Sequence, residues 1–542
     1  MLERRLAVSA CLVIAVALLV PQQLMAIPAF SRLYSTSCST CHLDFPKLND
    51  FGKAFKDAGF KFPKDDESMI KIPPVMLGAP AQAELWPKAI WPGKIPGIPP
   101  IGFRYNHIFQ VLSRNRNNFQ FAPAPDGTPV DVTDPTNFVP RTDFQAGTFS
   151  IFSAGNFGSD IAFWIDDDIS DAGQPSGLGD AYMKFVNLSR FLHLPTDSLT
   201  LRFGQFELEL PFSQARSWNL SDWDIYSQTN VGVLNPGFIN QNVNNGFGMA
   251  DAAQGVELSG GHHYGGYYYA FALMNQNTHG GAANGGDLVP AASAFFSDAN
   301  FKDIYGRFMY RFNLEKDKES RHSIQAAGAT GPRDHTYLSI GTLYFYGRSV
   351  QRFLGTAAND PSTPALLTAR EPFYRVGADF SFNVRTFNLF GQYLYGRDHS
   401  LVPVDDTGTP IPLDNTGALT IPTVGFIHGS PASFSGGFLQ ADYLAYPWLM
   451  LIMRYDGVNS RADRINGLGN IATNFFAPEH STRNRITPGV QFLIHANIKA
   501  AFEYQFRPSQ TIVAGIDPVT GAPITIRPFH TNSAVVSLDW VY

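Results

Sequence analysis

The larger, C-terminal part of the chain consists mainly of short runs in which apolar and polar residues alternate. In one such run, Phe502, Tyr504 and Phe506 alternate with Glu503 and Gln505. A repeat of two residues places successive side chains on opposite faces of an extended chain, so each run predicts a strand with one apolar and one polar face. We count about sixteen such runs. This number constrains the fold more than any other feature of the sequence.

The predicted strands are separated by a rhythm of short and long connections. The strands lie near 101–113, 144–154, 159–167, 179–187, 198–207, 252–260, 264–275, 302–313, 337–348, 372–384, 386–396, 433–445, 448–458, 484–495, 498–507 and 531–542. Short connections follow Ala154 and lie at 262–263, 384–385, 446–447 and 496–497. Long connections lie near 114–143, 208–251, 276–301, 349–371, 397–432, 459–483 and 508–530. The stretch 314–336 is long where this rhythm predicts a short turn.

This rhythm is typical of bacterial outer-membrane barrels, which have an even number of strands, short periplasmic turns and long outer loops. A sheet that spans a membrane must also close on itself, because lipid offers no partner for an unpaired backbone group. We therefore predict an all-β transmembrane barrel of about 16 antiparallel strands over residues 101–542. The alternative is a soluble β-sandwich or propeller.

Composition agrees with strands that face lipid. Charged residues make up 16% of the chain, compared with about 25% in typical soluble domains. Aromatic residues make up 13%, and the last predicted strand ends on Tyr542. The net charge of −6 is mild and gives no reason to expect a nucleic-acid partner.

The N-terminus has the pattern of a secretory signal peptide, which we predict over residues 1–26. Arg4 and Arg5 precede the apolar stretch 11–20, and Ala26 offers a small residue at a cleavage point. The apolar stretch is short for a membrane-spanning helix, which needs about 20 residues. A retained membrane anchor is the alternative interpretation.

The most specific motif is Cys38-x-x-Cys41-His42, the attachment signature of c-type haem. Two thiols at this spacing can form thioether bonds to the two vinyl groups of one haem, and the adjacent histidine can supply the proximal nitrogen to iron. We therefore predict one covalently attached haem c. The alternatives are a redox dithiol, a labile disulfide or half of a zinc site. A zinc site would need a second pair of ligands nearby, and none follows in the sequence.

The residues after the motif predict a small helical segment over 27–71. Residues 45–59 have the spacing of an amphipathic helix, with Pro46 in its first turn and Gly59 at its end. We expect its polar residues Lys47, Lys53, Lys56 and Asp57 to be exposed to water. Residues 72–100 contain eight prolines and predict an extended linker.

The distal ligand of the haem iron is open at this stage. Met69 and Met76 are the nearest methionines, and a thioether ligand would raise the reduction potential. His107 is the next histidine, but it alternates with aromatic residues and is expected on the apolar face of a strand. A five-coordinate iron, or a ligand from a barrel loop, is a further alternative.

Parity along the predicted strands places several arginines inside the barrel, where they could pair with haem propionates or line the lumen. They are Arg104, Arg202, Arg307, Arg311, Arg454 and Arg507. Asp166, Asp167 and Asp168 are expected in a loop, where they could hold a divalent cation or be solvated.

Taken together, the motif and the strands resemble the outer-membrane cytochrome–porin fusions, which include outer-membrane cytochromes of iron-oxidising bacteria. Residues 27–63 resemble the leading domain of that family at the level of the motif, and residues 101–542 resemble its barrel in architecture. The resemblance implies Cys38 and Cys41 as haem attachments and His42 as proximal ligand. It also implies electron transfer between an extracellular donor such as ferrous iron and periplasmic carriers such as soluble c-type cytochromes.

The sequence therefore predicts an electron-transfer protein of the bacterial outer membrane, with its haem segment in the periplasm or the barrel lumen. One alternative is a solute-conducting porin whose haem segment serves docking or sensing. Another is a haem enzyme such as a peroxidase, which would need an open sixth position on the iron.

Overall fold

The computed structural model describes the barrel, the segment that contains the haem motif and part of the connections between them. The described residues are 29–62, 66–76, 80–85, 94–95, 100–112, 141–157, 160–170, 175–213, 219–221, 224–227, 229–230, 246–247, 249, 252–275, 302–314, 335–357, 360–398, 401–405, 407–409, 425–428, 432–460, 484–506, 513–516, 523–525 and 532–542. The predicted signal peptide, residues 1–26, lies outside this set.

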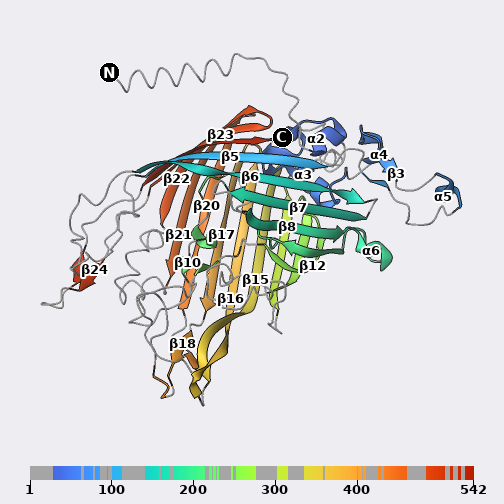
Figure 1. Cartoon of the computed structure of the whole chain (residues 1–542). Helices are drawn as coiled ribbons and strands as arrows, with labels where there is room; N and C mark the ends of the chain where they lie inside the picture. Colours follow the sequence, from blue (N-terminus) through green and yellow to red (C-terminus); the bar gives the residue numbers. More distant parts are fainter. Residues whose placement is uncertain are drawn as a thin grey trace, which may run out of the picture.

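Sixteen antiparallel strands form a closed barrel (Figure 1). They are β5 (Ile101–Leu112), β6 (Arg141–Phe157), β7 (Ile161–Ser170), β8 (Pro175–Phe185), β9 (Thr200–Phe206), β12 (Ala253–Gly261), β13 (Gly266–Met274), β14 (Asp303–Asn313), β15 (Thr336–Ala357), β16 (Asp360–Val384), β17 (Phe387–Asp398), β20 (Ala432–Tyr446), β21 (Leu449–Ser460), β22 (Arg485–His495), β23 (Ile498–Gln505) and β26 (Ser533–Val541). The last strand, β26, pairs with the first, β5, and closes the wall. This confirms the sixteen strands predicted from the sequence and excludes a sandwich or a propeller.

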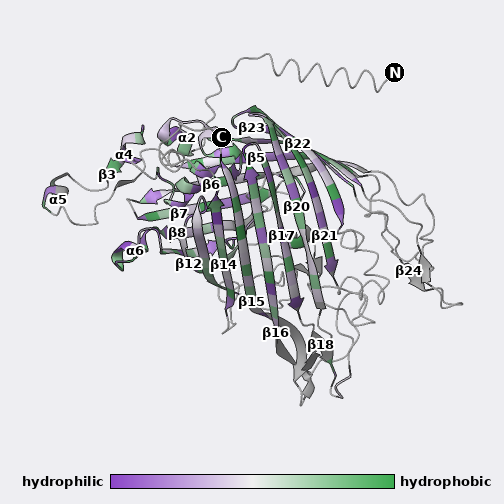
Figure 2. Ribbon diagram, turned by 180° about the vertical axis from the view of Figure 1, so that it is seen from behind, coloured by the Kyte–Doolittle hydropathy of each residue, from purple (hydrophilic) through white to green (hydrophobic). Residues whose placement is uncertain are grey.

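Side chains alternate between the two faces of the wall, as the period of two predicts. On β14, Phe308 is 51% exposed and Phe312 is 47% exposed, whereas the intervening Arg311 is only 3% exposed. Hydrophilic and hydrophobic positions alternate along the strands in Figure 2. An apolar outer face around a closed sheet is the arrangement of an outer-membrane barrel. In the part of the chain that the structure describes, no helix is long and apolar enough to cross a membrane.

The tight turns gather at one end of the barrel, which we call the short-turn end. The turns β6–β7, β12–β13, β16–β17, β20–β21 and β22–β23 lie there, as do the start of β5 and the C-terminus. In bacterial barrels the short turns face the periplasm. One expected long connection is wrong: residues 349–371 continue β15 and β16 as a paired hairpin. Most of the stretch 314–336 lies outside the described residues.

The aspartates 166–168 lie within β7 and not in a loop. Asp166 and Asp168 pair in register with Phe152 and Ser150 of β6, and the Asp166 carboxylate accepts hydrogen bonds from Trp164 Nε1 and the Asp180 backbone. The expectation that these aspartates lie in a loop is therefore wrong. Inward-facing polar residues of a strand can follow one another at a spacing of two without interrupting it.

Part of the predicted outer connection 208–251 turns into the barrel. We call residues 207–227, of which 207–213, 219–221 and 224–227 are described, the lumenal segment; it includes helix α7 (Asp224–Ser227). Its apolar side chains Leu208, Leu210, Ile225 and Tyr226 are at most 6% exposed and pack with inward residues of the wall. The short pairs β10 (Thr229–Asn230) and β11 (Gly246–Phe247), β18 (Leu401–Val404) and β19 (Gly425–His428), and β24 (Val513–Ile516) and β25 (Pro523–Thr525) lie in other connections.

The N-terminal part forms small elements at the short-turn end of the barrel (Figure 1). They are α2 (Ala29–Tyr34), η1 (Cys38–Thr40), β1 (His42–Asp44), β2 (Lys47–Leu48), α3 (Asp50–Asp57), α4 (Asp66–Met69), β3 (Val75–Met76), α5 (Pro80–Leu85) and β4 (Lys94–Ile95). Helix α3 is shorter than the predicted helix 45–59, because residues 42–48 form a small hairpin and Asn49 caps the helix. We call residues 29–62 the motif segment.

Candidate functional site

The haem motif is a single tight turn followed by the small hairpin. Cys38 begins the 3-10 helix η1, and the backbone N–H of Cys41 closes the turn by donating to the Cys38 carbonyl at 3.1 Å. His42 follows directly as the first residue of β1. Both cysteines are free thiols and, like His42, partly buried.

Asn49 joins this turn to helix α3. Its side-chain carbonyl accepts from the Gly52 backbone at 2.8 Å and caps the helix, and its amide donates to the Thr40 carbonyl at 3.0 Å. Its backbone N–H donates to the Cys41 carbonyl at 2.9 Å. Gly52 lies so close to the motif that a Cβ there would fall 2.1 Å from the Cys41 carbonyl oxygen. The helix and the motif are therefore held as one unit.

The His42 ring is oriented as a metal ligand requires. Its Nδ1 lies 3.2 Å from the Pro46 carbonyl oxygen. A carbonyl can only accept, so this hydrogen bond requires the proton on Nδ1 and leaves the lone pair on Nε2. Burial, with a further contribution from Lys499, lowers the pKa of His42 to about 4, so the imidazole is neutral near pH 7. Histidines that bind metals commonly donate their second ring N–H to a backbone carbonyl in this way.

The two thiols have the opposite character to reactive thiolates. Burial raises the pKa of Cys41 to about 12, with a smaller contribution from Cys38, and burial also raises the pKa of Cys38. Redox dithiols and zinc ligands depend on a lowered thiol pKa. Among the described residues, no three His, Cys, Asp or Glu side chains are grouped as a metal site. The raised pKa values are not those of an activated redox dithiol.

The motif segment lies in the mouth of the barrel at the short-turn end and contacts side chains of the wall. Lys499 of β23 donates to the Phe45 carbonyl at 2.8 Å, and Asp50 forms a buried bidentate ion pair with Arg311 of β14. On the remaining sides, the contacts are Lys47 with Asp442 of β20 at 2.6 Å, Asp57 with His263 of the β12–β13 turn at 2.8 Å, the Phe60 carbonyl with Asn156 of β6 at 3.3 Å and Arg32 with the Ile101 carbonyl of β5 at 2.5 Å.

These contacts correct the expectation that the polar residues of the predicted helix 45–59, of which Lys47 lies in β2 and the others in α3, are exposed to water. Lys47 and Asp57 bind the barrel, Lys53 pairs with Asp50 at 3.3 Å, and Lys56 lies 3.8 Å from Glu209 of the lumenal segment. The polar face of α3 is its docking face. An amphipathic pattern shows which face is polar, but it does not distinguish water from the polar interior of a barrel.

The apolar face of the motif segment packs in an aromatic cluster. Phe55, Phe60, Phe62 and Tyr34 form it, and Trp164 of β7 lies 5.6 Å from the Phe60 ring. Gly59, at a φ of +78°, lets the chain approach Val186 of the wall; a Cβ there would lie 2.7 Å from that side chain. The segment is thus bound to the wall by apolar as well as polar contacts.

The candidate distal ligands are placed differently from one another. Met69, at the end of α4, packs against the aromatic cluster. Met76 lies in β3, beside Lys94 of β4, and its side chain is outside what the structure describes. His107 lies on β5 between the rings of Tyr105 and Phe144, in the outer aromatic row that includes Trp540. This confirms the strand-face position expected for His107.

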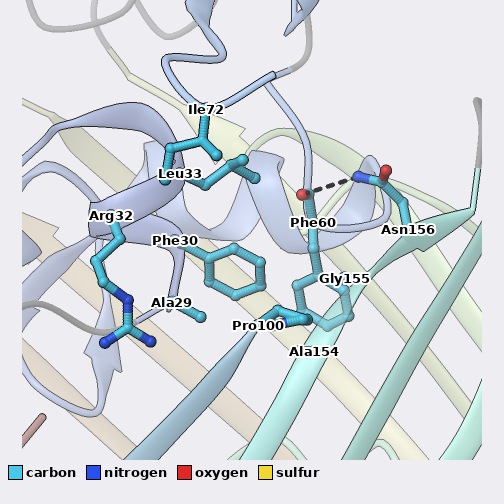
Figure 3. Close-up of a pocket in the computed structure, with 10 residues that line it drawn as sticks. All are labelled: Ala29, Phe30, Arg32, Leu33, Phe60, Ile72, Pro100, Ala154, Gly155 and Asn156. Carbon is cyan, nitrogen blue, oxygen red and sulfur yellow. Dashed lines mark hydrogen bonds between the residues drawn. The ribbon is translucent and has the colours of Figure 1, made fainter. Parts of the chain in front are cut away.

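A cavity of about 30 Å³ lies between the motif segment and the wall, lined by Phe30, Leu33, Phe60 and Pro100 among others (Figure 3). This volume is about that of one water molecule in the liquid. It is a packing gap beside the motif segment and not a space for a porphyrin.

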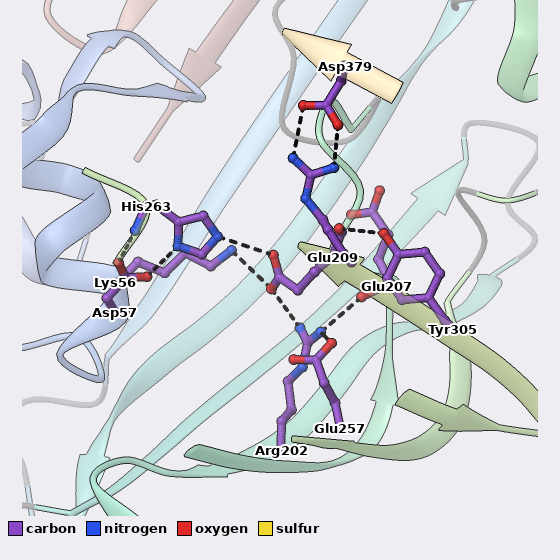
Figure 4. A network of polar contacts seen from close by, with 10 residues as sticks. Lys56, Asp57, Arg202, Glu207, Glu209, Glu257, His263, Tyr305 and Asp379 are labelled. Carbon is purple, nitrogen blue, oxygen red and sulfur yellow. Dashed lines mark hydrogen bonds and ion pairs between the residues drawn. The ribbon is translucent and has the colours of Figure 1, made fainter. Parts of the chain in front are cut away.

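The predicted inward arginines form ion pairs in the lumen. Arg202 pairs with Glu257, Arg307 with Asp379, Arg104 with Asp539 and Arg454 with Asp456. Arg507 lies outside the described residues. Figure 4 shows how these pairs connect to the motif segment: Glu209 lies 3.8 Å from Lys56, 3.4 Å from Arg202 and 3.9 Å from His263.

The lumenal segment is held across the width of the barrel. Leu220 and Ser221 donate backbone hydrogen bonds to Glu503 of β23, Asn219 donates to Gln440 of β20, and Tyr305 of β14 donates to the Glu209 carbonyl. The inward charged residues Arg375, Arg454 and Asp539 are at most 1% exposed. The sequence pattern did not reveal this arrangement, because it depends on a connection folding back into the lumen.

No family model and no curated protein matches this chain. Among solved structures, an anion-selective porin from Comamonas acidovorans is similar at 10% identity, covering 82% of this chain and 98% of that one, with a TM-score of 0.41. Salmonella typhi OmpF, in a complex with daunomycin, is similar at 10% identity over 83% of this chain and 98% of that one, also with a TM-score of 0.41. Pseudomonas putida OprB gives 9% identity, 85% and 96% coverage and a TM-score of 0.36.

Proposed function

We propose that this chain is an outer-membrane c-type cytochrome that transfers electrons between an extracellular donor, such as ferrous iron, and periplasmic carriers such as soluble c-type cytochromes. Cys38 and Cys41 would hold one haem c through thioether bonds, and Nε2 of His42 would be the proximal ligand. Haem supplies one-electron chemistry at a potential set by its axial ligands and its surroundings.

The observation that carries this proposal is the geometry of the Cys38–Cys41–His42 turn. The hydrogen bond from His42 Nδ1 to Pro46 leaves Nε2 without a proton, and burial keeps the ring neutral, which is the state that an iron ligand would need. Asn49 and Gly52 hold α3 against the same turn. Pro46, Asn49 and Gly52 all belong to the motif segment. They would therefore hold the His42 ring in the same orientation in both oxidation states of the iron.

The position of the motif segment supports a role between two compartments. The segment contacts inward side chains at the end where short turns face the periplasm, such as Lys499 and Asp442. Beyond it, the lumenal segment and buried ion pairs occupy the barrel. These groups would exclude water and solutes from the lumen. A barrel closed in this way could hold a redox centre without letting solutes cross the membrane.

A solute-conducting porin with a haem docking or sensing segment is the second candidate. The closed wall with its polar inner face is what a solute channel needs, so the fold supports this candidate at least as directly as electron transfer. The haem motif and the burial of the lumenal side chains are what favour the first proposal.

The test uses purified protein in sealed liposomes that enclose a soluble c-type cytochrome. Ferrous iron is added outside, and reduction of the enclosed cytochrome is followed by its absorbance. We expect reduction with the intact chain and none with the Cys38→Ala/Cys41→Ala variant, which keeps the barrel. Liposome swelling in sugars is measured in parallel. Swelling without reduction of the enclosed cytochrome would establish the porin function and exclude the conduit.

A further inference from the structure

We propose that the turn between β8 and β9, residues 186–199, is a membrane foot that inserts into the periplasmic leaflet of the outer membrane. It is much longer than the other described turns at this end, such as 385–386 and 496–497. It contains the short helix α6 (Leu188–Phe191), which projects sideways from the barrel in Figure 1. This inference does not depend on the proposed electron transfer.

The tip of this turn is apolar and exposed. Phe191 is 67% exposed, Leu192 is 57% exposed and Leu194 is 47% exposed. Three large apolar side chains within four residues form a patch, whereas single exposed apolar residues are common on any protein surface. Such a patch on a short, rigid element needs an apolar surrounding.

The turn is well ordered by its own hydrogen bonds, so the apolar tip is not a consequence of a loosely held loop. Ser189, which is 0% exposed, donates to the Leu199 carbonyl and accepts from the Leu194 backbone at 2.9 Å. Tyr269 of β13 donates to the Ser198 carbonyl at 2.8 Å, and Gly261 donates to the Asp197 carbonyl at 2.8 Å. These hydrogen bonds hold the base of the turn against β12 and β13.

We assign lipid to this patch because the turn that carries it starts directly from the lipid-facing surface of the wall. Phe185, the last residue of β8, stacks on the outward-facing Phe203 of β9 with ring centroids 5.9 Å apart. The next residue, Val186, faces the motif segment instead. The chain then leaves the wall, and the exposed apolar residues of the turn lie beyond the ends of β8 and β9 (Figure 1).

The position also matches the interface between acyl chains and headgroups. Trp448 and Tyr446, which are stacked at the β20–β21 turn and 50% and 56% exposed, mark an aromatic girdle at the same end of the barrel. Arg190, exposed next to Phe191, supplies a cation for lipid phosphates. Interfacial helices with this division of residues lie with their apolar side about 5–10 Å within the headgroup and acyl boundary.

The test places a nitroxide label on Leu192→Cys in protein held singly in nanodiscs of phosphatidylethanolamine and phosphatidylglycerol. Its collision rates with oxygen and with a water-soluble nickel complex are compared. Phe203→Cys, on the outward face of the wall, is the lipid-exposed control, and Glu67→Cys, exposed on α4, is the aqueous control. The unsubstituted protein gives the background from Cys38 and Cys41, so the result does not depend on haem attachment.

We expect the ratio of oxygen to nickel collisions at Leu192→Cys to resemble that at Phe203→Cys and to exceed that at Glu67→Cys several-fold. Heat-modifiable gel migration shows that each variant retains its barrel. A ratio equal to that of Glu67→Cys would overturn the proposal. Protection that develops only when several copies share a disc would assign the patch to a second copy of this chain and would equally overturn a lipid foot.

Discussion

At the scale of single residues, two histidines differ in what their rings contact. The sequence offers both His42 and His107 as possible iron ligands. The first directs Nδ1 at a carbonyl and keeps Nε2 for a ligand, whereas the second is stacked in the outer row of the wall. The motif predicts His42 as the proximal ligand, but the Pro46 carbonyl that sets its tautomer could not be identified from the spacing alone.

The first prediction separates these two histidines. His42→Ala should leave the thioether bonds intact, shift the Soret band and lower the rate of electron transfer by more than the roughly 10–100-fold that removal of an outer-shell partner costs. His107→Ala should leave the spectrum and the rate unchanged. Absorbance spectra and the liposome assay check both variants. Equal behaviour of the two would remove His42 from the iron.

The second prediction concerns Asn49. Asn49→Ala removes the cap of α3 and the hydrogen bond to Thr40, and should lower the free energy of unfolding of the motif segment by about 0.5–2 kcal/mol. Asn49→Asp keeps an acceptor for the Gly52 N–H but removes the donor to Thr40. Urea titration of the two variants should therefore place Asn49→Asp between Asn49→Ala and the unsubstituted chain. An order with Asn49→Asp as the least stable would contradict this division of the two contacts.

At the scale of elements, the strands were predictable and their connections were not. A period of two is a local property, and it gave all sixteen strands to within a few residues, apart from the extended hairpin of β15 and β16. The inward course of residues 207–227 depends on partners far along the chain, such as Glu503 and Gln440. The polar face of α3 likewise finds its partners on distant strands, so amphipathicity alone could not identify what it contacts.

The third prediction tests how α3 is docked. Asp50→Asn leaves the Arg311 guanidinium buried without its carboxylate, which costs about 3–5 kcal/mol for a pair of this kind. The double variant Asp50→Asn/Arg311→Gln should recover a large part of that loss. Lys71→Ala, at an exposed position, should change stability by no more than about 0.5 kcal/mol. Pulse proteolysis of the motif segment in urea measures all three, and a double variant no better than the single one would contradict the pairing.

The fourth prediction is a pH dependence of the same docking. Burial alone would raise the pKa of Asp50, but Lys53 and Arg311 lower it well below the ordinary 3.8. A carboxyl whose pKa is lower in the folded state stabilises that state above its unfolded pKa and loses this contribution as the pH falls. The motif segment should therefore stay docked above about pH 4 and become sensitive to pepsin as the pH falls further. Asp50→Asn should weaken this dependence, and an unchanged pH profile would contradict it.

At the scale of the whole molecule, the described part of the lumenal segment packs against inward side chains of the barrel wall. The lumenal segment, the motif segment and the ion pair between them form one set of contacts from the short-turn end into the lumen. The wall and the motif can be predicted from the sequence, whereas the contact between the motif segment and the lumenal segment is seen only in the structure.

The fifth prediction follows from that interior. In planar bilayers the unsubstituted protein should conduct small ions poorly, and Glu503→Ala, which releases Leu220 and Ser221 of the lumenal segment, should increase the conductance several-fold. The outward-facing Phe502→Ala on the same strand is the matched control and should have no effect. A large, steady conductance of the unsubstituted protein would contradict a sealed lumen.

The central claim is that the thiols of Cys38 and Cys41 carry a haem at the mouth of this barrel. The most direct measurement is the mass of the denatured mature protein after acid-acetone washing, made in a host that attaches c-type haem. We predict the mass of the polypeptide plus one haem, with a Soret band that the washing does not remove, and neither feature in Cys38→Ala/Cys41→Ala. A mass equal to that of the polypeptide alone would contradict the account and leave an outer-membrane barrel without its redox centre.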